Sequence, residues 1–475
     1  MIPGLENLLP ACELPDFQSA LLRFSDRCIR SRVDRTLDRL PFATECVPWY
    51  GGGYWIVDPS VRPGGELSFA VADYYIQDAA SLLPLRLLDV QPKDRICDLC
   101  ASPGGKATAI AERLGAEGVL IANEAIQSRM DVLRHNLART GRANYATCRS
   151  DPELLALRCT DLFNKILVDV PCSGQTLVGP GKHDESAFRP QHIEHCSLRA
   201  RRILGTAARM LSPGGMLVLS TCTFSVEENE SQIEWLQQEF PGIWEPIVIP
   251  ELSRWQSPLR EGCYRLWPHR DRCRGGFAAA LRKIGETDRA VGLDTLHENE
   301  VRDHRTARKG TGHSASRKKD NSLDMELWLK ELGTWPIGYH VCGQSANIEE
   351  PGIEQFFEVL GDRKFFQSAM VAVLAGKHLE PTHALAMANA TWFAPHRELL
   401  LSDADATAFM SGQSLGKGGA GTVSRPETST GSWARGVWQD KPIGWLKESS
   451  NRWNNHLPAW ARMTINASPT GRGLA

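Results

Sequence analysis

Two cysteines have the residue type and spacing that covalent catalysis requires: Cys172 in the run DVPCSG and Cys222 in STCTFS. Each follows an apolar stretch rich in Val, Ile and Leu, at 165–170 and 215–220, and such stretches predict buried strands of a parallel sheet. Catalytic groups of open α/β sheets collect at the carboxyl ends of the strands, so neighbouring strands would bring both thiols to one cleft. Most of the other cysteines are expected to pack as small hydrophobic side chains.

A thiolate in such a cleft could activate a pyrimidine ring. Its addition to carbon 6 of cytosine makes carbon 5 nucleophilic enough to attack an electrophilic methyl group, and a thiolate is also a workable leaving group. Asp169, shortly before Cys172, could protonate or hydrogen-bond the ring nitrogen if an apolar site keeps its carboxyl neutral. A paired base would have to be unstacked to reach the thiols, and the second thiol could assist the final elimination.

The run DLCASPGGK (98–106) lies where a predicted strand turns into a helix, and its glycines let the backbone approach a ligand. Its spacing matches neither a Walker A loop nor GxGxxG. Glu124 ends the next predicted strand, where it could bind ribose hydroxyls, and Asp151 follows the third, where it could hold an adenine amino group. A nucleoside cofactor held without a phosphate loop fits S-adenosylmethionine.

The elements that must position these residues lie between about 93 and 284, where short apolar strands alternate with helical segments. This alternation predicts a doubly wound α/β sheet, with residues 265–284 as a closing pair of strands. Upstream of it, the pattern predicts a helix, a hairpin around glycines and a second helix, at 21–40, 47–57 and 74–90.

The composition limits the classes of protein that fit. The 475 residues suffice for about two to four domains, and 42% hydrophobic with 23% charged residues is ordinary for a globular chain. The 13 cysteines lack zinc-ligand spacing, and neither a signal peptide nor a bilayer-spanning stretch is evident, so we expect a cytoplasmic protein without a metal or a membrane partner. The net charge of −2 is no general sign of nucleic-acid binding, although basic patches can form locally.

Seven runs between about 30 and 285 resemble, in order and approximate spacing, those of the RNA cytosine-5 methyltransferases of the Sun/Fmu type: YYIQDAAS (74–81), DLCASPGGKAT (98–108), ANE (122–124), RHN (134–136), DVPCSG (169–174), STCTFSVEENE (220–230) and RLWPHRDRCRGGFAAALRK (265–283). The resemblance implies a Rossmann-like class I methyltransferase sheet. It also implies that Cys222 is the nucleophile, that Cys172 promotes product release, and that Asp169 orients or protonates the base and touches the cofactor.

By the same resemblance, S-adenosylmethionine is held by one loop and three strand-end carboxylates: Cys100, Ala101, Ser102, Pro103, Gly104, Gly105, Lys106, Glu124, Asp151 and Asp169. Small-subunit rRNA is the expected substrate, with tRNA as the alternative. A non-catalytic RNA-binding assembly factor is a second hypothesis, against which the intact thiol pair argues, and a methyltransferase of small molecules or proteins is a third. Ser102 and Val170 each replace a usual Ala, and the loop after Cys172 departs further from the family, which leaves the RNA open.

Five parts are expected along the chain: an N-terminal accessory RNA-binding α+β module (1–75), the catalytic domain (76–285), a polar linker (286–322), a small α-rich domain (323–400) and a C-terminal region (401–475). In the last part, KPIGWLK and NNHLPAWAR resemble the RNA-binding tail of some family members, which implies a PUA-like RNA-binding domain. The linker is either a solvated connection or a basic arm that touches phosphates. In the last region, tryptophans interleaved with basic residues could stack on RNA bases, or they could form the core of a small β module. The protein is expected to act as a monomer.

Overall fold

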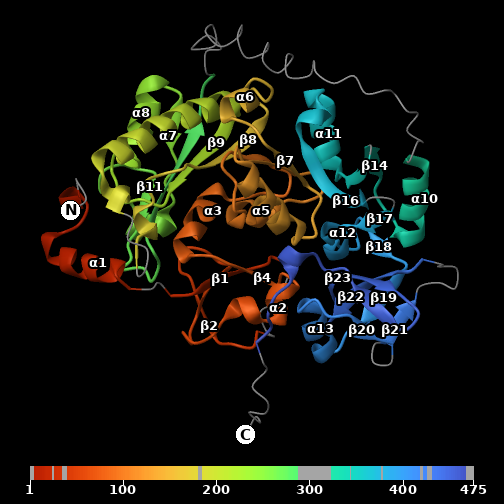
Figure 1. Cartoon of the computed structure of the whole chain (residues 1–475). Helices are drawn as coiled ribbons and strands as arrows, with labels where there is room; N and C mark the ends of the chain where they lie inside the picture. Colours follow the sequence, from red (N-terminus) through yellow and green to blue (C-terminus); the bar gives the residue numbers. More distant parts are fainter. Residues whose placement is uncertain are drawn as a thin grey trace.

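The computed structural model describes residues 5–23, 26–34, 40–179, 185–286, 322–342, 344–375, 378–417, 421–424 and 431–466. Its central feature is a sheet of five parallel strands in the order β9-β8-β5-β6-β7, with β12 antiparallel at the edge of β9 (Figure 1). The strands are β5 Arg95–Asp98, β6 Val119–Asn123, β7 Tyr145–Cys148, β8 Phe163–Asp169, β9 Leu211–Thr221 and β12 Gly276–Lys283. The predicted doubly wound sheet is confirmed.

Helices cover both faces of this sheet. On one face lie α3 Leu83–Leu88, α4 Gly105–Arg113 and α5 Gln127–Ala138, and on the other lie α6 Pro152–Ala156, α7 Pro190–Met210 and α8 Glu230–Glu239. Successive strand residues alternate between the two cores, as where Ile96 packs in one and Cys97 in the other. The predicted closing pair consists of β11 Cys263–Leu266 and β12, which also pairs with β10 Trp244–Pro246.

The N-terminal module is a four-stranded antiparallel sheet in the order β2-β3-β1-β4, preceded by α1 Leu14–Leu21. Its strands are β1 Cys28–Ser31, β2 Thr44–Cys46, β3 Gly53–Ile56 and β4 Tyr74–Ile76, and α2 Leu67–Ala70 precedes β4. The predicted hairpin at 47–57 corresponds to the turn between β2 and β3 and to β3 itself. The helix predicted over 21–40 is wrong, because β1 lies within it and its buried Arg30 pairs with Glu112 of α4.

The helix predicted over 74–90 is only partly present. Its first residues pair with β1 as β4, and helical structure starts after Asp78, whose carboxylate caps the 3-10 turn Ala79–Leu82 ahead of α3. Strand pairing with β1 therefore overrides the apolar periodicity of this segment.

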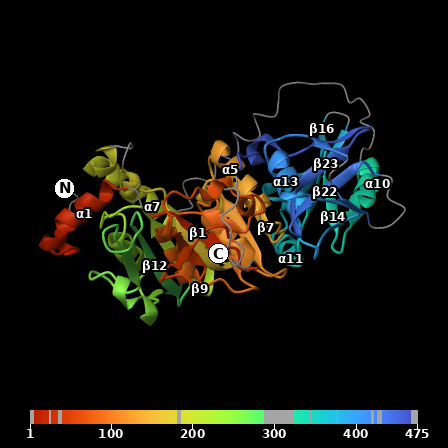
Figure 2. The same ribbon diagram turned by 90° about the horizontal axis from the view of Figure 1, so that it is seen from below.

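The C-terminal part extends the central sheet. β16 Gln367–Ala375 pairs antiparallel with β7, and beyond it lie β15 Ser345–Ile348 and β14 Tyr339–Cys342, while β17 His378–Pro381 also pairs with β16. The helices here are α10 Ser322–Leu332, α11 Pro351–Leu360 and α12 His383–Met387, and a short pair is formed by β13 Gly333–Thr334 and β18 Ala394–Pro395. The segment 323–400 is thus mixed α/β rather than α-rich. Figure 2 shows α10 and β14 at the end of the molecule opposite α1.

The last region forms a curled six-stranded mixed sheet in the order β20-β24-β23-β22-β19-β21, together with α13 Asp403–Met410. Its strands are β19 Arg397–Leu400, β20 Leu415–Gly416, β21 Gly421–Ser424, β22 Trp433–Trp438, β23 Lys441–Glu448 and β24 Arg452–Asn455. β19 starts ahead of the boundary expected at 401. Four tryptophans of this region lie in its interior, whereas Trp460 is 39% exposed. The core interpretation therefore holds for those four.

The C-terminal sheet is fastened to the N-terminal module. Lys441 pairs with Asp73 at 2.5 Å, and the backbone N–H of Asn466 donates to the carbonyl of Gly65 at 2.8 Å. The predicted linker lies almost entirely outside the described residues and stays a prediction. In the described part of the chain, no helix is both long and apolar enough to cross a membrane.

Candidate active site

The two thiols meet at the carboxyl ends of β8 and β9. These strands are parallel neighbours in which Asp169 pairs with Ser220, so both chains leave the sheet at the same edge. The Sγ atoms of Cys172 and Cys222 are 3.0 Å apart, and the backbone N–H of Cys222 donates to Sγ of Cys172 at 3.3 Å. The predicted adjacency of the two strands is confirmed, and it brings the two thiols into contact.

The contact between the thiols makes them chemically unequal. A hydrogen bond from Cys172 lowers the pKa of Cys222, against the opposing effects of burial and of the Asp169 charge, while Lys106 contributes in the same direction as the hydrogen bond. The same hydrogen bond, followed by burial, raises the pKa of Cys172 well above its ordinary value. The first proton lost from the pair therefore leaves a thiolate on Cys222, with Cys172 as its hydrogen-bond donor.

A buried carboxylate holds the two loops that follow the cysteines. Glu228, which is 1% exposed, accepts hydrogen bonds from the backbone N–H of Ser173 at 2.8 Å, from its hydroxyl at 2.5 Å and from the hydroxyl of Thr223 at 3.3 Å. Ser173 directly follows Cys172 and Thr223 directly follows Cys222. Glu228 therefore fixes the positions of both thiols relative to each other.

The sequence hypothesis needed an apolar site around Asp169, but in the structure polar groups surround its carboxylate. One of its carboxylate oxygens is 2.7 Å from the ammonium of Lys106, and the other accepts a hydrogen bond of 2.5 Å from the Ser220 hydroxyl. Burial opposes the charge on Lys106, but Asp169 and then Asp98 raise the pKa of this lysine. Lys106 of the glycine-rich loop therefore stays charged beside Asp169.

The carboxyl group held near neutrality is Asp98, which the sequence interpretation did not single out. It is 1% exposed, and burial, followed by the charge of Asp169, raises its pKa to about 7. Its position as the last residue of β5, directly before the glycine-rich loop, was the signal that could have identified it.

Two cavities adjoin the glycine-rich loop, and Cys100 lines both. One, of about 190 Å³, is mainly apolar and contains Glu124 and Asp151. Asp151 caps α6 through the N–H of Glu153 at 2.9 Å, and Glu124 accepts from the N–H of Ile126 at 3.0 Å. The other, of about 270 Å³, contains Asp98 and the rest of the predicted loop except Gly104: Ala101, Ser102, Pro103, Gly105, Lys106 and, beside them, Asp169.

Gly104 is the loop residue that packs against α5. We call the loop and the two cavities beside it the cofactor cradle. The φ of Gly104, +113°, is a left-handed conformation that favours glycine, and a Cβ at this position would come within 3.2 Å of Cβ of Asn136 on α5. The loop can therefore lie close against α5, which leaves its other side open to a ligand. The structure brings all the predicted cofactor residues to this loop and to the carboxyl ends of three other strands, β6, β7 and β8.

The cavities fit the two ends of S-adenosylmethionine. The buried carboxyl group of Asp98 lines the larger cavity together with Gln77, whose two amide atoms are buried without a hydrogen-bond partner among the described residues. A ligand with an ammonium and a carboxylate group, such as the methionine end of this cofactor, would satisfy these atoms. The apolar cavity with Glu124 and Asp151 at its rim suits an adenosine. Within the described ranges, no cluster of three His, Cys, Asp or Glu residues could hold a metal ion.

Comparison with known proteins identifies the family of the chain. Residues 85–282 match the family described as 16S rRNA methyltransferase RsmB/F. The chain is 31% identical over 326 residues to Ribosomal RNA small subunit methyltransferase F of Escherichia coli O9:H4 (strain HS), which covers 65% of this chain and 67% of that protein. It is 36% identical over 248 residues to the protein of the same name from Enterobacter sp. (strain 638), over 50% of this chain and 51% of that one.

Solved structures give the same result for the fold. A methyltransferase homolog protein from Pyrococcus horikoshii is 26% identical, with a TM-score of 0.51 over 58% of this chain and 92% of that chain. NSun6 from Pyrococcus horikoshii shares the fold at 20% identity, with a TM-score of 0.51 over 59% of this chain and 97% of that chain. The chain therefore belongs to the 16S rRNA methyltransferase RsmB/F family and is an rRNA methyltransferase whose cofactor is S-adenosylmethionine.

Proposed function

We propose that this protein methylates carbon 5 of a cytosine in 16S rRNA through a covalent bond between Cys222 and the RNA. The observation that carries the proposal is the pair of thiols 3.0 Å apart at neighbouring strand ends, beside the cofactor cradle. A methyltransferase acting on an amine or a hydroxyl group needs no such pair. Methylation of carbon 5 of cytosine needs a thiolate, because this carbon becomes nucleophilic only while a thiolate is bound at carbon 6. The second thiol of the pair then assists the release of the first.

Each residue of the site has a distinct task in this reaction. Cys222 adds to carbon 6, since its pKa is the lowered one of the pair. Asp169, held by Lys106 and Ser220, orients the cytosine, and the Lys106 ammonium supplies positive charge and a hydrogen-bond donor where the ring accumulates negative charge. S-adenosylmethionine, when bound, supplies the methyl group. After transfer, a water molecule accepts the proton from carbon 5, the carbon 5–carbon 6 double bond forms again, and the carbon 6–sulfur bond breaks. Cys172 hydrogen-bonds to the Cys222 thiolate as it is expelled.

The cradle residues position the donor. Cys100 to Lys106, with Glu124 and Asp151, hold the nucleoside and methionine ends, and Asp98 binds the ammonium group. The cytosine must leave the base stack to reach Cys222, so an unpaired or extruded nucleotide is the form that reacts.

The test is methylation of RNA with isotopically labelled cofactor, followed by identification of the product nucleoside by mass spectrometry. Unmodified 16S rRNA should gain 5-methylcytosine, and an equal pool of tRNA serves as the alternative substrate. 5-Methylcytosine in the tRNA pool alone would transfer the proposal to tRNA. Its absence from both pools would refute the reaction and favour a non-catalytic assembly factor.

Cysteine variants test the two roles separately. Cys222→Ala should lose turnover and form no covalent adduct, whereas Cys172→Ala should retain RNA in a denaturant-resistant adduct, because release is impaired. Cys342→Ala is the matched control, since this thiol is exposed on β14 at the other end of the sheet. An adduct in Cys222→Ala, with none in Cys172→Ala, would reverse the assignment.

A further inference from the structure

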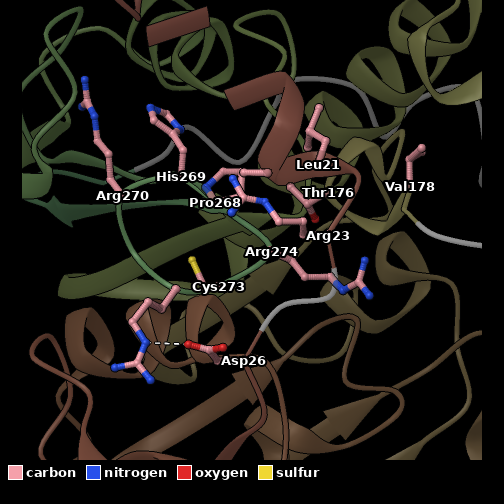
Figure 3. A pocket seen from close by; sticks show the side chains of 12 residues that line it. Leu21, Arg23, Asp26, Thr176, Val178, Pro268, His269, Arg270, Cys273 and Arg274 are labelled. Carbon is pink, nitrogen blue, oxygen red and sulfur yellow. Dashed lines mark hydrogen bonds and ion pairs between the residues drawn. The ribbon is translucent and has the colours of Figure 1, made fainter. Parts of the chain in front are cut away.

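A third cavity, of about 260 Å³, lies next to Cys222 and shares no lining residue with the cofactor cradle. Three segments that are distant in sequence form it: the end of α1 and the residues after it, the loop after Cys172, and the loop between β11 and β12 (Figure 3). Thr176 connects it to the thiols, because its N–H and its hydroxyl both donate to the carbonyl of Cys222 at 3.1 Å. We call it the arginine cavity.

Its charge differs from that of the whole chain. Five basic or potentially basic side chains line it, against the single acid Asp26: Arg23, His269, Arg270, Arg272 and Arg274. Arg270 pairs with Glu13 at 2.5 Å, and Arg272 pairs with Asp26 at 2.5 Å and with Glu45 at 2.6 Å. Arg23 and Arg274 form no ion pair with any described residue. With a net charge of −2 over the chain, this concentration is local.

The loop that carries four of these side chains is held in place. The backbone N–H of Arg274 donates to both carboxylate oxygens of Asp78, at 3.1 and 3.3 Å, and Asp78 also lines the cofactor cradle. On the other side, the carbonyl of Arg272 accepts from the indole N–H of Trp55 at 3.0 Å, and its guanidinium lies 4.5 Å over that ring. These contacts tie the loop to Asp78 of the cofactor cavity and to Trp55 of the N-terminal module.

We propose that the arginine cavity holds a backbone phosphate of the RNA strand beside the nucleotide that reacts with Cys222, which deepens the proposed function and rests on it. Guanidinium groups match the oxygens of a phosphate by paired hydrogen bonds, and the two arginines of this cavity that form no ion pair with a described residue suit a singly charged phosphodiester together with a neighbouring one. An extruded nucleotide has its flanking phosphates within one nucleotide of the base, and Thr176, which lines the cavity, is hydrogen-bonded to the backbone of Cys222. Holding that phosphate keeps the base extruded without reading its sequence.

RNA binding by the double variant Arg23→Gln/Arg274→Gln tests the site. Both side chains are at least partly exposed, so the fold should survive, which circular dichroism and unchanged binding of S-adenosylmethionine would verify. Arg95→Gln is the matched control, because this exposed arginine starts β5 at the opposite edge of the sheet. The probe is a fluorescent single-stranded RNA that contains one cytosine, and its dissociation constant is measured over a series of salt concentrations.

We expect the double variant to bind this RNA about ten- to a hundredfold more weakly at low salt. The slope of log K against log salt should fall by roughly 0.7 for each lost phosphate contact, while Arg95→Gln keeps the slope of the parent protein. An unchanged affinity and slope would overturn the proposal. So would a loss of binding to polyglutamate without a loss of binding to RNA, since that would assign the cavity to an acidic peptide.

The same measurements separate this inference from the proposed function. If the parent protein binds the RNA with the expected salt dependence but methylates no RNA, the proposed reaction fails while the phosphate site stands. If it methylates RNA and the double variant shows the parent's affinity, slope and KM for RNA, the phosphate site fails while the reaction stands.

Discussion

Glu228 is expected to determine whether the thiols are correctly placed, and its substitution is a sharp test of the site. In Glu228→Ala, the buried N–H of Ser173 and the hydroxyls of Ser173 and Thr223 lose their acceptor. An unsatisfied buried donor costs about 1–3 kcal/mol. Displacement of a catalytic group by about 1 Å can cost on the order of a hundredfold in rate. Glu228→Gln retains one acceptor oxygen and should lose far less of both.

The assays are denaturant unfolding and single-turnover methylation, with Glu239→Gln of α8 as the exposed control. The expected order of turnover is the parent protein and Glu239→Gln together, then Glu228→Gln, then Glu228→Ala, with binding of S-adenosylmethionine unchanged throughout. Glu228→Ala with the parent's turnover and stability would refute the reasoning that this carboxylate positions the thiols.

The pH dependence of stability supplies an independent check. Burial raises the pKa of Glu228 in the folded protein, although its hydrogen bonds with Ser173 oppose this. The folded state therefore favours the neutral carboxyl group. This contribution is complete below the ordinary pKa of 4.5 and is lost as the pH rises through the raised value. The free energy of unfolding of Glu228→Gln relative to the parent protein should accordingly increase over that pH range, and a constant difference would contradict the assignment.

Three further predictions follow from other parts of the molecule. Because burial raises the pKa of Asp98 to about 7, calorimetric affinity for S-adenosylmethionine should increase as the pH rises through that value, and Asp98→Asn should abolish the dependence. Gly104→Ala should lower the free energy of unfolding by about 1–3 kcal/mol and weaken cofactor binding, because φ is +113° and the added Cβ would approach Asn136. Glu230→Ala should cost about 3–5 kcal/mol in denaturant unfolding, because it leaves the buried guanidinium of Arg265 unpaired; exposed Glu234→Ala should cost far less.

The parts of the fold that could be predicted from sequence are those whose signal is local. The strands before the two cysteines are continuous apolar runs. Such runs are typical of strands in a sheet that is buried on both faces, so they indicate these strands directly. The failures share one cause, which is pairing with a distant segment. The run 21–40 has helical periodicity, but β1 within it pairs with β3 and β4, and its Arg30 is buried against Glu112 of α4. β16 joins the sheet through β7, more than two hundred residues upstream, and nothing near it in sequence indicates this pairing.

The same distinction applies to the site. The cofactor loop and both cysteines lie in short runs with recognisable spacing, so they could be named in advance. Glu228 lies inside one of those runs, but its contact with Ser173 depends on how two loops fold over each other. The arginine cavity combines residues that are far apart in sequence. Arg23 and Arg274 line the same cavity only in the folded structure.

The register of β8 and β9 links the fold to the proposed chemistry. With Asp169 opposite Ser220, the two thiols approach to 3.0 Å, so a second loss of a proton would place two thiolates in contact. The pair therefore releases one proton readily and retains the other, as coupled groups do. In the proposed reaction the thiolate on Cys222 is the attacking group, and the proton kept on Cys172 faces the same sulfur when it must leave. One strand register thus supplies both a nucleophile and the hydrogen-bond donor that stabilises its departure.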